Sequence, residues 1–428
     1  MTARSVLAYG YNADGAPEPL RNAAVAALDL FGRMRISEPA VVFASSPEDG
    51  AQALTWQTMA SGAGNGAAWN ANTRAIDMTL AAAGYVVRQS YAYVRYELGR
   101  PVRVILTGNW GNDVATTRER GQFDAANGVY WQRRPDGTFA VGVRSSTSGT
   151  VVNTIIEVAD WNGDAVAITP SHNNVFLIEY VWLGAFAVRW GVATGSGVKY
   201  VHTEVFADRL AASYMQTATL PLRDAIYADA APASPATMQI VCAQVESEGG
   251  YLLTPTLPWA GRRTVANVIA AATAPNEAPI VAVRPALLKG SGGVVNRATI
   301  LVDEVEIYST AAADWSVWYF PPGTANPITG GAWAAANPGA AVEVNASGTA
   351  LNLSGGYRIA SGVAVASGTG GSARGATASQ VQQVLPLTLD ICGANSPLTS
   401  NVGANPGYIV LAATGTGNVS GAINGRQL

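Results

Sequence analysis

The sequence predicts an all-β protein made of β-sandwich or jelly-roll modules, with a short N-terminal arm or helix. Apolar and polar residues alternate in many short runs, and clusters of Gly, Asn, Asp and Pro separate these runs. Helical periodicity is scarce, and no helices alternate with the strands as they do around a parallel sheet. Together these observations favour a sandwich or jelly roll.

The expected strands are short, and the longest apolar stretch covers residues 175–190. Gly184 interrupts this stretch, which therefore predicts two core strands, or one bent strand, at the centre of a sandwich. Residues 21–31 are rich in Ala and form the best candidate for a short helix. The other expected strands lie at 76–80, 102–106, 139–143, 238–245, 299–308, 315–320, 341–344, 383–390 and 408–413.

Turn residues separate several of these runs. Pro135-Asp136-Gly137 lies between two strand candidates and predicts a hairpin, because Pro presets φ and Gly supplies a positive φ. The segments 127–128 and 162–164 carry similar signals.

The expected domains are an N-terminal arm or short helix at 1–30, a main β-sandwich at 31–310 and a C-terminal β domain at 311–428. Residues 330–379 are rich in Ala, Gly, Ser and Thr. This composition indicates either a domain boundary or a region that neighbouring subunits cover. No internal repeat of fixed period is present, which argues against a β-helix, a propeller or a solenoid.

Charge is scarce: charged residues make up 13% of the 428 residues, against about 25% in ordinary soluble domains. A weakly charged surface predicts coverage by neighbouring subunits, and hence a homo-oligomer. The alternative is an ordinary protein whose composition reflects codon usage. A net charge of −3 and the absence of a basic run argue against nucleic acid as a partner.

The two cysteines, Cys242 and Cys392, have no metal-ligand or disulfide-framework spacing, so we expect buried free thiols, no metal and no cofactor. Residues 1–10 lack the apolar stretch of a signal peptide. No run reaches the ~18 apolar residues of a membrane-spanning helix, so no membrane partner is expected. The protein is expected to be made in the cytoplasm.

Candidate catalytic residues are few. His172 and His202 are the two histidines, and no G-x-S-x-G motif surrounds any serine, so hydrogen-bonded packing roles are favoured over catalysis. The glycine-rich segment 62–66 looks like a phosphate-binding loop, but no apolar strand leads into it and no Lys-Ser/Thr follows it. A plain loop is the preferred interpretation.

Two groups of carboxylates raise the possibility of glycoside hydrolysis, which requires two such groups on opposite sides of a sugar. One group is Asp303, Glu304 and Glu306, and the other is Glu246 and Glu248. Neighbours on one strand cannot flank a bond in this way, so solvated strand faces are the preferred interpretation.

The eleven tryptophans are spread over most of the chain, which suits core packing and contacts between subunits. A stacking platform for carbohydrate is the functional alternative. These residues are Trp56, Trp69, Trp110, Trp131, Trp161, Trp182, Trp190, Trp259, Trp315, Trp318 and Trp333.

Residues 31–39 resemble the FGRLRVSxP signature near the N-terminus of a family of tailed-bacteriophage virion structural proteins. Met34 and Ile36 stand where Leu and Val are commoner. The resemblance covers residues 28–250 and, more loosely, 385–390, but 423–426 lack the aromatic residue expected there. Further similar blocks follow in the family's order at 93–110, 120–128, 144–149, 160–164, 180–184, 200–202, 214–215, 220–223 and 247–250.

The resemblance implies a non-enzymatic virion component without catalytic residues: a tail-fibre, tail-appendage or baseplate-associated homo-oligomer, expected to be a trimer by analogy with fibres. Its implied partners are copies of itself and other virion proteins. A capsid decoration or head-spike protein is the alternative. A polysaccharide-degrading spike and a carbohydrate-binding module that contacts host surface glycans are further alternatives.

Assembly or docking is assigned to Phe31, Arg33, Arg35 and Trp182. Arg33 and Arg35 alternate with apolar residues, so one face of this segment can be buried while the guanidinium groups bind a neighbouring chain. An ion pair within the chain is the alternative.

Overall fold

The computed structural model of the chain divides into two compact units. The first comprises Met1–Ala51, Ala60–Arg88 and Val94–Leu252, and the second comprises Gln52–Met59, Gln89–Tyr93 and Leu253–Leu428. The structure describes residues 9–11, 17–19, 39–248, 257–264, 269–272, 276–286, 288–289, 294–298, 300–337, 340–364 and 405–427.

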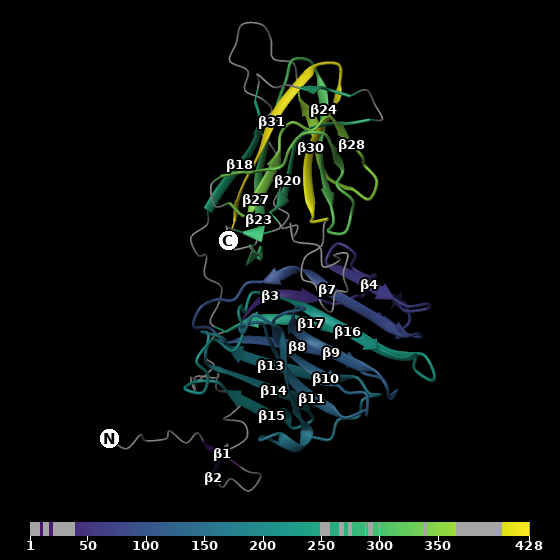
Figure 1. Cartoon of the computed structure of the whole chain (residues 1–428), viewed down its shortest axis with the longest axis vertical. Helices are drawn as coiled ribbons and strands as arrows, with labels where there is room; N and C mark the ends of the chain where they lie inside the picture. Colours follow the sequence, from purple (N-terminus) through teal and green to yellow (C-terminus); the bar gives the residue numbers. More distant parts are fainter. Residues whose placement is uncertain are drawn as a thin grey trace, which may run out of the picture. The chain divides into compact units, whose positions relative to one another are not determined.

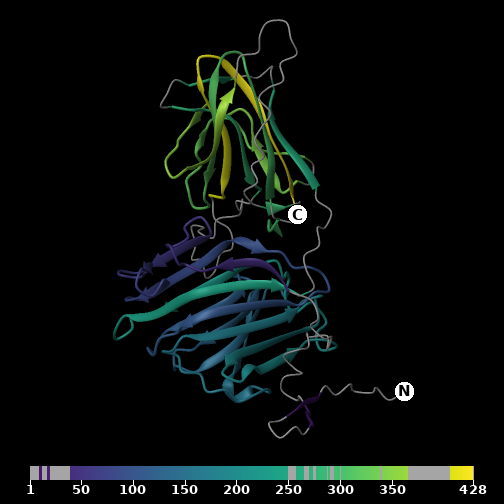
Figure 2. The same cartoon turned by 180° about the vertical axis from the view of Figure 1, so that it is seen from behind.

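Most of the first unit is a sandwich of two antiparallel sheets, drawn in purple to teal in Figures 1 and 2. The seven-stranded sheet has the order β12 (Val152–Glu157), β11 (Phe139–Ser145), β10 (Gly128–Arg133), β9 (Thr117–Phe123), β16 (Leu220–Ala228), β7 (Gly84–Val94) and β4 (Trp56–Ser61). The eight-stranded sheet has the order β15 (Gly197–Val205), β14 (Ala187–Thr194), β13 (Asn174–Val181), β8 (Val102–Asn109), β17 (Ala236–Ser247), β6 (Ala75–Leu80) and β5 (Gly66–Asn70), with β3 (Ala40–Ser45) also paired to β17.

Aromatic side chains fill the space between these two sheets. Trp131 of β10 packs against Phe176 of β13 with ring centroids 4.9 Å apart, and its Nε1 donates a hydrogen bond to the carbonyl of Leu177 at 3.1 Å. Trp190 of β14 donates to the carbonyl of Tyr130 at 3.2 Å. Large buried rings of this kind dominate the energetics of a core, and the indole N–H groups find partners across the sandwich.

The same core also contains ionised groups. Nε of Arg120 on β9 lies 2.7 Å from Oδ1 of Asp224 on the neighbouring strand β16, and both side chains are almost fully buried. Next to this pair, the Tyr180 hydroxyl donates to Oε1 of Gln122 at 3.0 Å. A buried charge pair ties β9 to β16, because removing one partner would leave the other uncompensated in the core.

The second unit is a smaller sandwich. Its four-stranded sheet contains β18 (Leu257–Arg263), β31 (Asn418–Gln427), β19 (Ile269–Ala270) and β23 (Ile300–Ser309). Its six-stranded sheet has the order β26 (Ala334–Ala335), β27 (Val342–Asn345), β20 (Ala278–Pro285), β30 (Tyr408–Gly415), β24 (Ala313–Phe320) and β29 (Tyr357–Ala364). Buried side chains from both sheets form one core, including Trp259, Val281, Trp315, Leu411 and Ile423.

Three short pairs and one 3-10 helix complete the described chain. The pairs are β1 (Tyr9–Tyr11) with β2 (Pro17–Pro19), β21 (Leu288–Lys289) with β22 (Val294–Val295), and β25 (Ile328–Thr329) with β28 (Ala350–Leu351). The helix η1 (Val158–Asp160) follows β12. No helix in the part that the structure describes has the length and apolar character to cross a membrane.

The predicted all-β sandwich class is confirmed. Residues 175–190 form β13 and β14, the two-strand alternative, and the predicted hairpin joins β10 to β11 with Gly137 at φ 87°. The strands on either side of residue 311, β23 and β24, lie in one unit. The predicted helix at 21–31 and strand at 383–390 lie outside the described residues.

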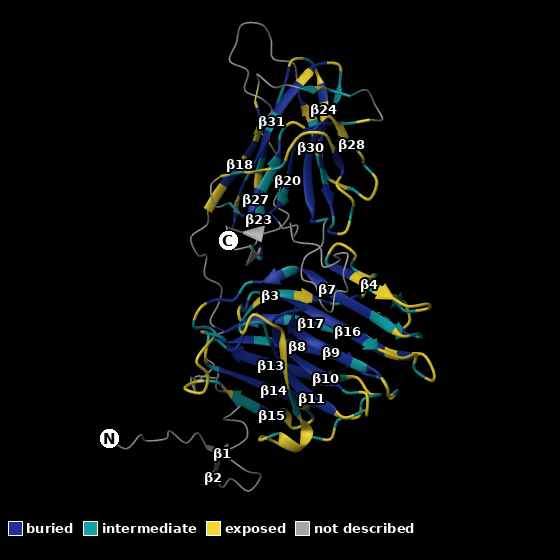
Figure 3. Cartoon of the chain, in the orientation of Figure 1, coloured by how far each residue is buried: buried dark blue, intermediate teal, exposed yellow. Residues whose placement is uncertain are grey.

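Burial follows the strands, and exposed residues gather in the connecting loops (Figure 3). The alternation is clearest in β8, where buried and half-buried residues follow one another along the whole strand. On β9, β10 and β11, by contrast, nearly every residue is buried on both faces of the sheet. The outer face of these three strands is therefore packed rather than simply solvated.

Gly142 on β11 gives a test of this packing. A Cβ atom at this position would overlap ring atoms Cε2 and Cζ of Tyr130. We expect Gly142→Ala to lower the free energy of unfolding by about 1–3 kcal/mol, because the ring has no room to shift. Chemical denaturation measures the change. Gly66→Ala is the matched control, since a Cβ there meets no atom within 4 Å; equal stability of the two variants would contradict the packing.

Candidate functional site

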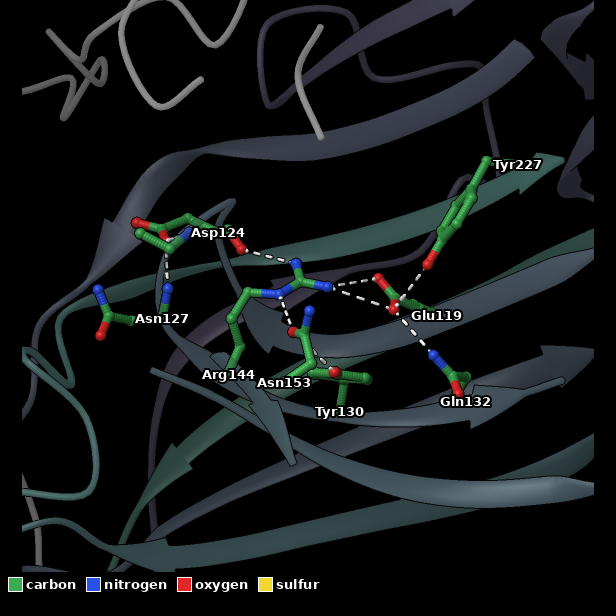
Figure 4. Close-up of polar contacts among 9 residues, drawn as sticks. Glu119, Asp124, Asn127, Tyr130, Gln132, Arg144, Asn153 and Tyr227 are labelled. Carbon is green, nitrogen blue, oxygen red and sulfur yellow. Dashed lines mark hydrogen bonds and ion pairs between the residues drawn. The ribbon is translucent and has the colours of Figure 1, made fainter. Parts of the chain in front are cut away.

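A network of polar side chains lies on the outer face of the seven-stranded sheet. Arg120 and Trp131 are register partners and point into the sandwich. Alternate residues of a strand face opposite sides, so Glu119 on β9 and Tyr130 and Gln132 on β10 point outward. The outward side chains meet those of β11, β12 and β16, and the network therefore spans five adjacent strands (Figure 4).

Arg144 of β11 lies at the centre of the network. Its Nε donates to Oδ1 of Asn153 at 2.7 Å, and Nη1 donates to the backbone carbonyl of Asp124 at 3.0 Å. Its Nη2 lies 3.0 Å and 3.3 Å from the two carboxylate oxygens of Glu119. All three guanidinium nitrogens thus bond to the protein, which fixes the plane of the group.

Glu119 is bonded as completely as Arg144. Besides the guanidinium, its Oε1 accepts hydrogen bonds from Gln132 Nε2 at 3.0 Å and from the Tyr227 hydroxyl at 3.1 Å. The carboxylate of Asp124 points elsewhere and accepts the backbone N–H groups of Ala126 and Asn127 in the turn before β10. Glu119 is therefore the carboxylate that balances Arg144.

Two aromatic rings lie close to the Arg144 guanidinium. The Arg144 guanidinium lies 5.1 Å from the ring centroids of both Phe123 and Tyr130, within the range of cation–π attraction. Burial raises the pKa of Tyr130, and the nearby Glu119 raises it further. Burial also raises the pKa of Tyr227. For Arg144, burial alone would lower the pKa, but Glu119, Tyr130 and Tyr227 raise it overall. The tyrosines stay neutral and the arginine stays charged.

The rim of the network faces solvent. Glu119, Tyr130 and Arg144 are buried and Gln132 is 9% exposed, whereas Asn153 on the edge strand β12 is exposed and Tyr227 is half-buried. Among the described residues, Asn153 Nδ2 and Gln132 Oε1 make no hydrogen bond to the protein. The arrangement therefore offers an amide donor on the exposed Asn153 and an amide acceptor on the largely buried Gln132. Arg144 and Tyr130 hold the first side chain, and Glu119 holds the second.

Of the four residues assigned to assembly, the structure describes Trp182. Phe31, Arg33 and Arg35 lie outside the described residues. Trp182 is half-buried, and its Nε1 donates to the carbonyl of Met215 at 3.0 Å while its ring meets Tyr96 edge-on at 5.9 Å. Its role in docking stays a prediction, as do the expected homo-oligomer and the virion localisation.

The two histidines differ. His202 packs as predicted: it is 3% exposed, and its ring lies 5.9 Å from that of Trp190. His172 is exposed in the loop before β13, so the predicted packing role is wrong for it; a polar loop at a sheet end leaves the ring in solvent. In the described part of the chain, no group of three or more His, Cys, Asp or Glu side chains could hold a metal ion.

The prediction of solvated faces is wrong for Glu246 and Glu248, whose side chains are 8% and 7% exposed. The reason is Arg103 on the neighbouring strand β8, whose Nε lies 2.7 Å from Glu246 and whose Nη1 lies 3.7 Å from Glu248. A cation between two glutamates allows both to be buried.

Asp303 and Glu306 of β23 and the glycine-rich loop are in the expected surroundings, whereas Glu304 is half-buried. Asp303 pairs with Arg426 at 3.2 Å with both side chains largely exposed, and Glu306 is exposed. In the loop 62–66, the Asn65 side chain bonds to the backbone of Ser61, Ala81 and Ala82 and closes the connection between β4 and β5. Cys242 is a free thiol, as predicted, but it is half-buried rather than buried, and Cys392 lies outside the described residues.

No family model and no curated protein matches the chain. Among solved structures, the chain is similar to a Bacillus licheniformis β-glucanase (10% identity, 49% of this chain and 99% of that one, TM-score 0.30). It is also similar to a putative β-glucanase from Mycobacterium abscessus (11%, 48% and 100%, 0.34). A third match is a Bacteroides ovatus mixed-linkage glucan GH16 protein (7%, 47% and 99%, 0.35).

These matches correct the main functional prediction. The named structures are a β-glucanase, a putative β-glucanase and a GH16 protein, and none of them is a virion component. The expected non-enzymatic virion building block is therefore wrong, and the expectation that the chain is not an enzyme is not retained. At these identities and TM-scores no activity is transferred to this chain, so any function must be argued from its own side chains.

The buried histidine gives a test by pH. Burial lowers the pKa of His202, against the raising effects of Glu204 and Asp160. The native state then binds fewer protons than the unfolded chain below about pH 6.5, so stability is lost as the pH falls through that region. We expect His202→Gln to reduce this loss, measured by denaturation between about pH 7.5 and 5. His172→Gln, at an exposed position, is the control and should retain the wild-type pH dependence; identical profiles for both variants would contradict the assignment.

Proposed function

We propose that the chain binds carbohydrate through the outer face of its seven-stranded sheet, at the rim formed by Asn153, Gln132 and Tyr227. The observation that supports the proposal is the hydrogen-bonded network of Glu119 and Arg144, which holds these planar polar groups in fixed positions. A sugar offers hydroxyl groups that both donate and accept, so it can use the amide donor of Asn153 and the amide acceptor of Gln132 together.

Preorganisation favours binding over a merely structural role. An isolated polar side chain on a strand face is mobile. A ligand that orders it binds more weakly, because the side chain loses conformational entropy on binding. At this site the cost is met during folding, because Asn153 is held by Arg144 and Tyr130, and Gln132 by Glu119. A single fixed orientation of several donors and acceptors is what a specific polar site requires.

The proposal concerns binding and not cleavage. Among the described residues, Glu119 is the one carboxylate that bonds to Arg144 in this network. Hydrolysis by a pair of carboxylates requires a second one across the bond. Glycan cleavage by the chain is a separate question, which the similarity to the glucanases raises. Reducing ends released from each polysaccharide, measured on the same preparations, report cleavage independently of binding.

The proposal predicts a loss of binding in Asn153→Asp. This change keeps the oxygen that Arg144 and Tyr130 use but replaces the donating amide by an acidic oxygen. We expect affinity for a bound glycan to fall about tenfold, the effect of one lost hydrogen bond plus a poorly placed charge. Affinity electrophoresis on a panel of polysaccharides, followed by calorimetry on soluble oligosaccharides, measures the change.

Asn173→Asp supplies the matched control, because it introduces the same charge at an exposed loop position on the other sheet. It should bind as the wild type does. A wild-type chain that binds no glycan of the panel while retaining a native circular dichroism spectrum, or an Asn153→Asp variant with unchanged affinity, would remove the proposal.

A further inference from the structure

We infer that the site selects neutral sugar residues and discriminates against acidic ones; the inference rests on the proposed function and adds the class of ligand. The charges that could recognise an acidic group cancel within the protein. Arg144 Nη2 contacts both oxygens of Glu119, and its other two nitrogens bond to Asn153 and to the Asp124 carbonyl. No guanidinium nitrogen is left without a protein partner.

The groups at the rim carry no charge. Asn153 Nδ2 is a neutral donor, Gln132 Oε1 is a neutral acceptor, and the Tyr227 hydroxyl donates to Glu119 and retains its oxygen as an acceptor. This set matches neighbouring hydroxyl groups of a neutral sugar, each of which donates and accepts. A carboxylate or sulfate only accepts, so it would leave Gln132 Oε1 and the Tyr227 oxygen facing a second acceptor.

Other cations near the network do not alter this balance. Arg223 lies on the same face of the neighbouring strand β16, but it is 1% exposed and stands over Phe123 with 5.7 Å between its guanidinium carbon and the ring centroid. The half-buried Arg134 pairs with Glu157 of β12. An acidic ligand would therefore lose its hydration without gaining an ion pair, which is unfavourable in a partly buried site.

Glu119 is accordingly a positioning and specificity-determining residue. With Gln at this position, Arg144 loses its counter-charge while keeping its bonds to Asn153 and Asp124, so a positive charge is left next to the rim. An acidic ligand can then form an ion pair with Arg144, which in the wild type is neutralised by Glu119.

The test compares each neutral glycan that the full chain binds with its carboxymethylated form, so that backbone and linkage stay constant. At about 0.15 M salt, we expect the wild type to bind the neutral form at least about tenfold more tightly. Glu119→Gln should shift this ratio by about tenfold toward the acidic form. Glu306→Gln removes an exposed carboxylate on β23, outside the network, and should leave the ratio unchanged.

The outcomes separate the inference from the proposed function. Equal or tighter binding of the carboxymethylated form by the wild type overturns the inference and leaves carbohydrate binding intact, whereas no binding of any glycan overturns both. If Glu119→Gln fails to fold, a salt series on the wild type decides. Affinity for the neutral glycan should change less than about twofold from 0.02 to 0.5 M salt, because no charge is recognised; a steep salt dependence contradicts the inference.

Discussion

Pairing of buried charges is the constraint on which the first unit depends. Its core contains the Arg120–Asp224 pair, and its two outer faces contain Arg144 with Glu119 and Arg103 with Glu246. Each pair joins different strands of one sheet. An unpaired guanidinium or carboxylate at these depths would cost several kcal/mol, so the sheets are stable only in the register that brings these partners together.

This constraint changes the interpretation of the low charge content. A weakly charged surface predicted that neighbouring subunits cover the chain, since few ionised groups remain for solvation. The structure shows that part of the small charge content lies inside the protein: Glu119, Arg120 and Asp224 are almost completely buried. The number of charged residues in the sequence therefore does not by itself give the charge of the solvent-exposed surface. Some of these residues are exposed, whereas others are buried in ion pairs.

The sequence predicted the sheets far better than the site. Alternation located β6, β8 and β11, and the apolar stretch at 175–190 predicted two core strands, because burial of one face imposes a period of two. On β9 that rule fails, since charged residues point to both faces and all are buried. Glu119 is 25 residues from Arg144 and 108 from Tyr227, so no local motif reports that they meet. The glycines opposite Tyr130, Gly121 and Gly142, are the sequence signal that was missed.

The five-strand origin of the network also has a kinetic consequence. Tyr227 and Asp224 reach β9 only after more than 100 residues of intervening chain have been ordered. Contacts so distant in sequence form slowly, because the entropy of closing a long loop is lost before the contacts stabilise the product. During synthesis, β9 to β12 emerge before Asp224, the ion-pair partner of Arg120. We therefore expect the outer face to be completed late, when β16 docks. A nascent chain that stops before residue 220 contains β10 and β12 but lacks β16, which carries Tyr227.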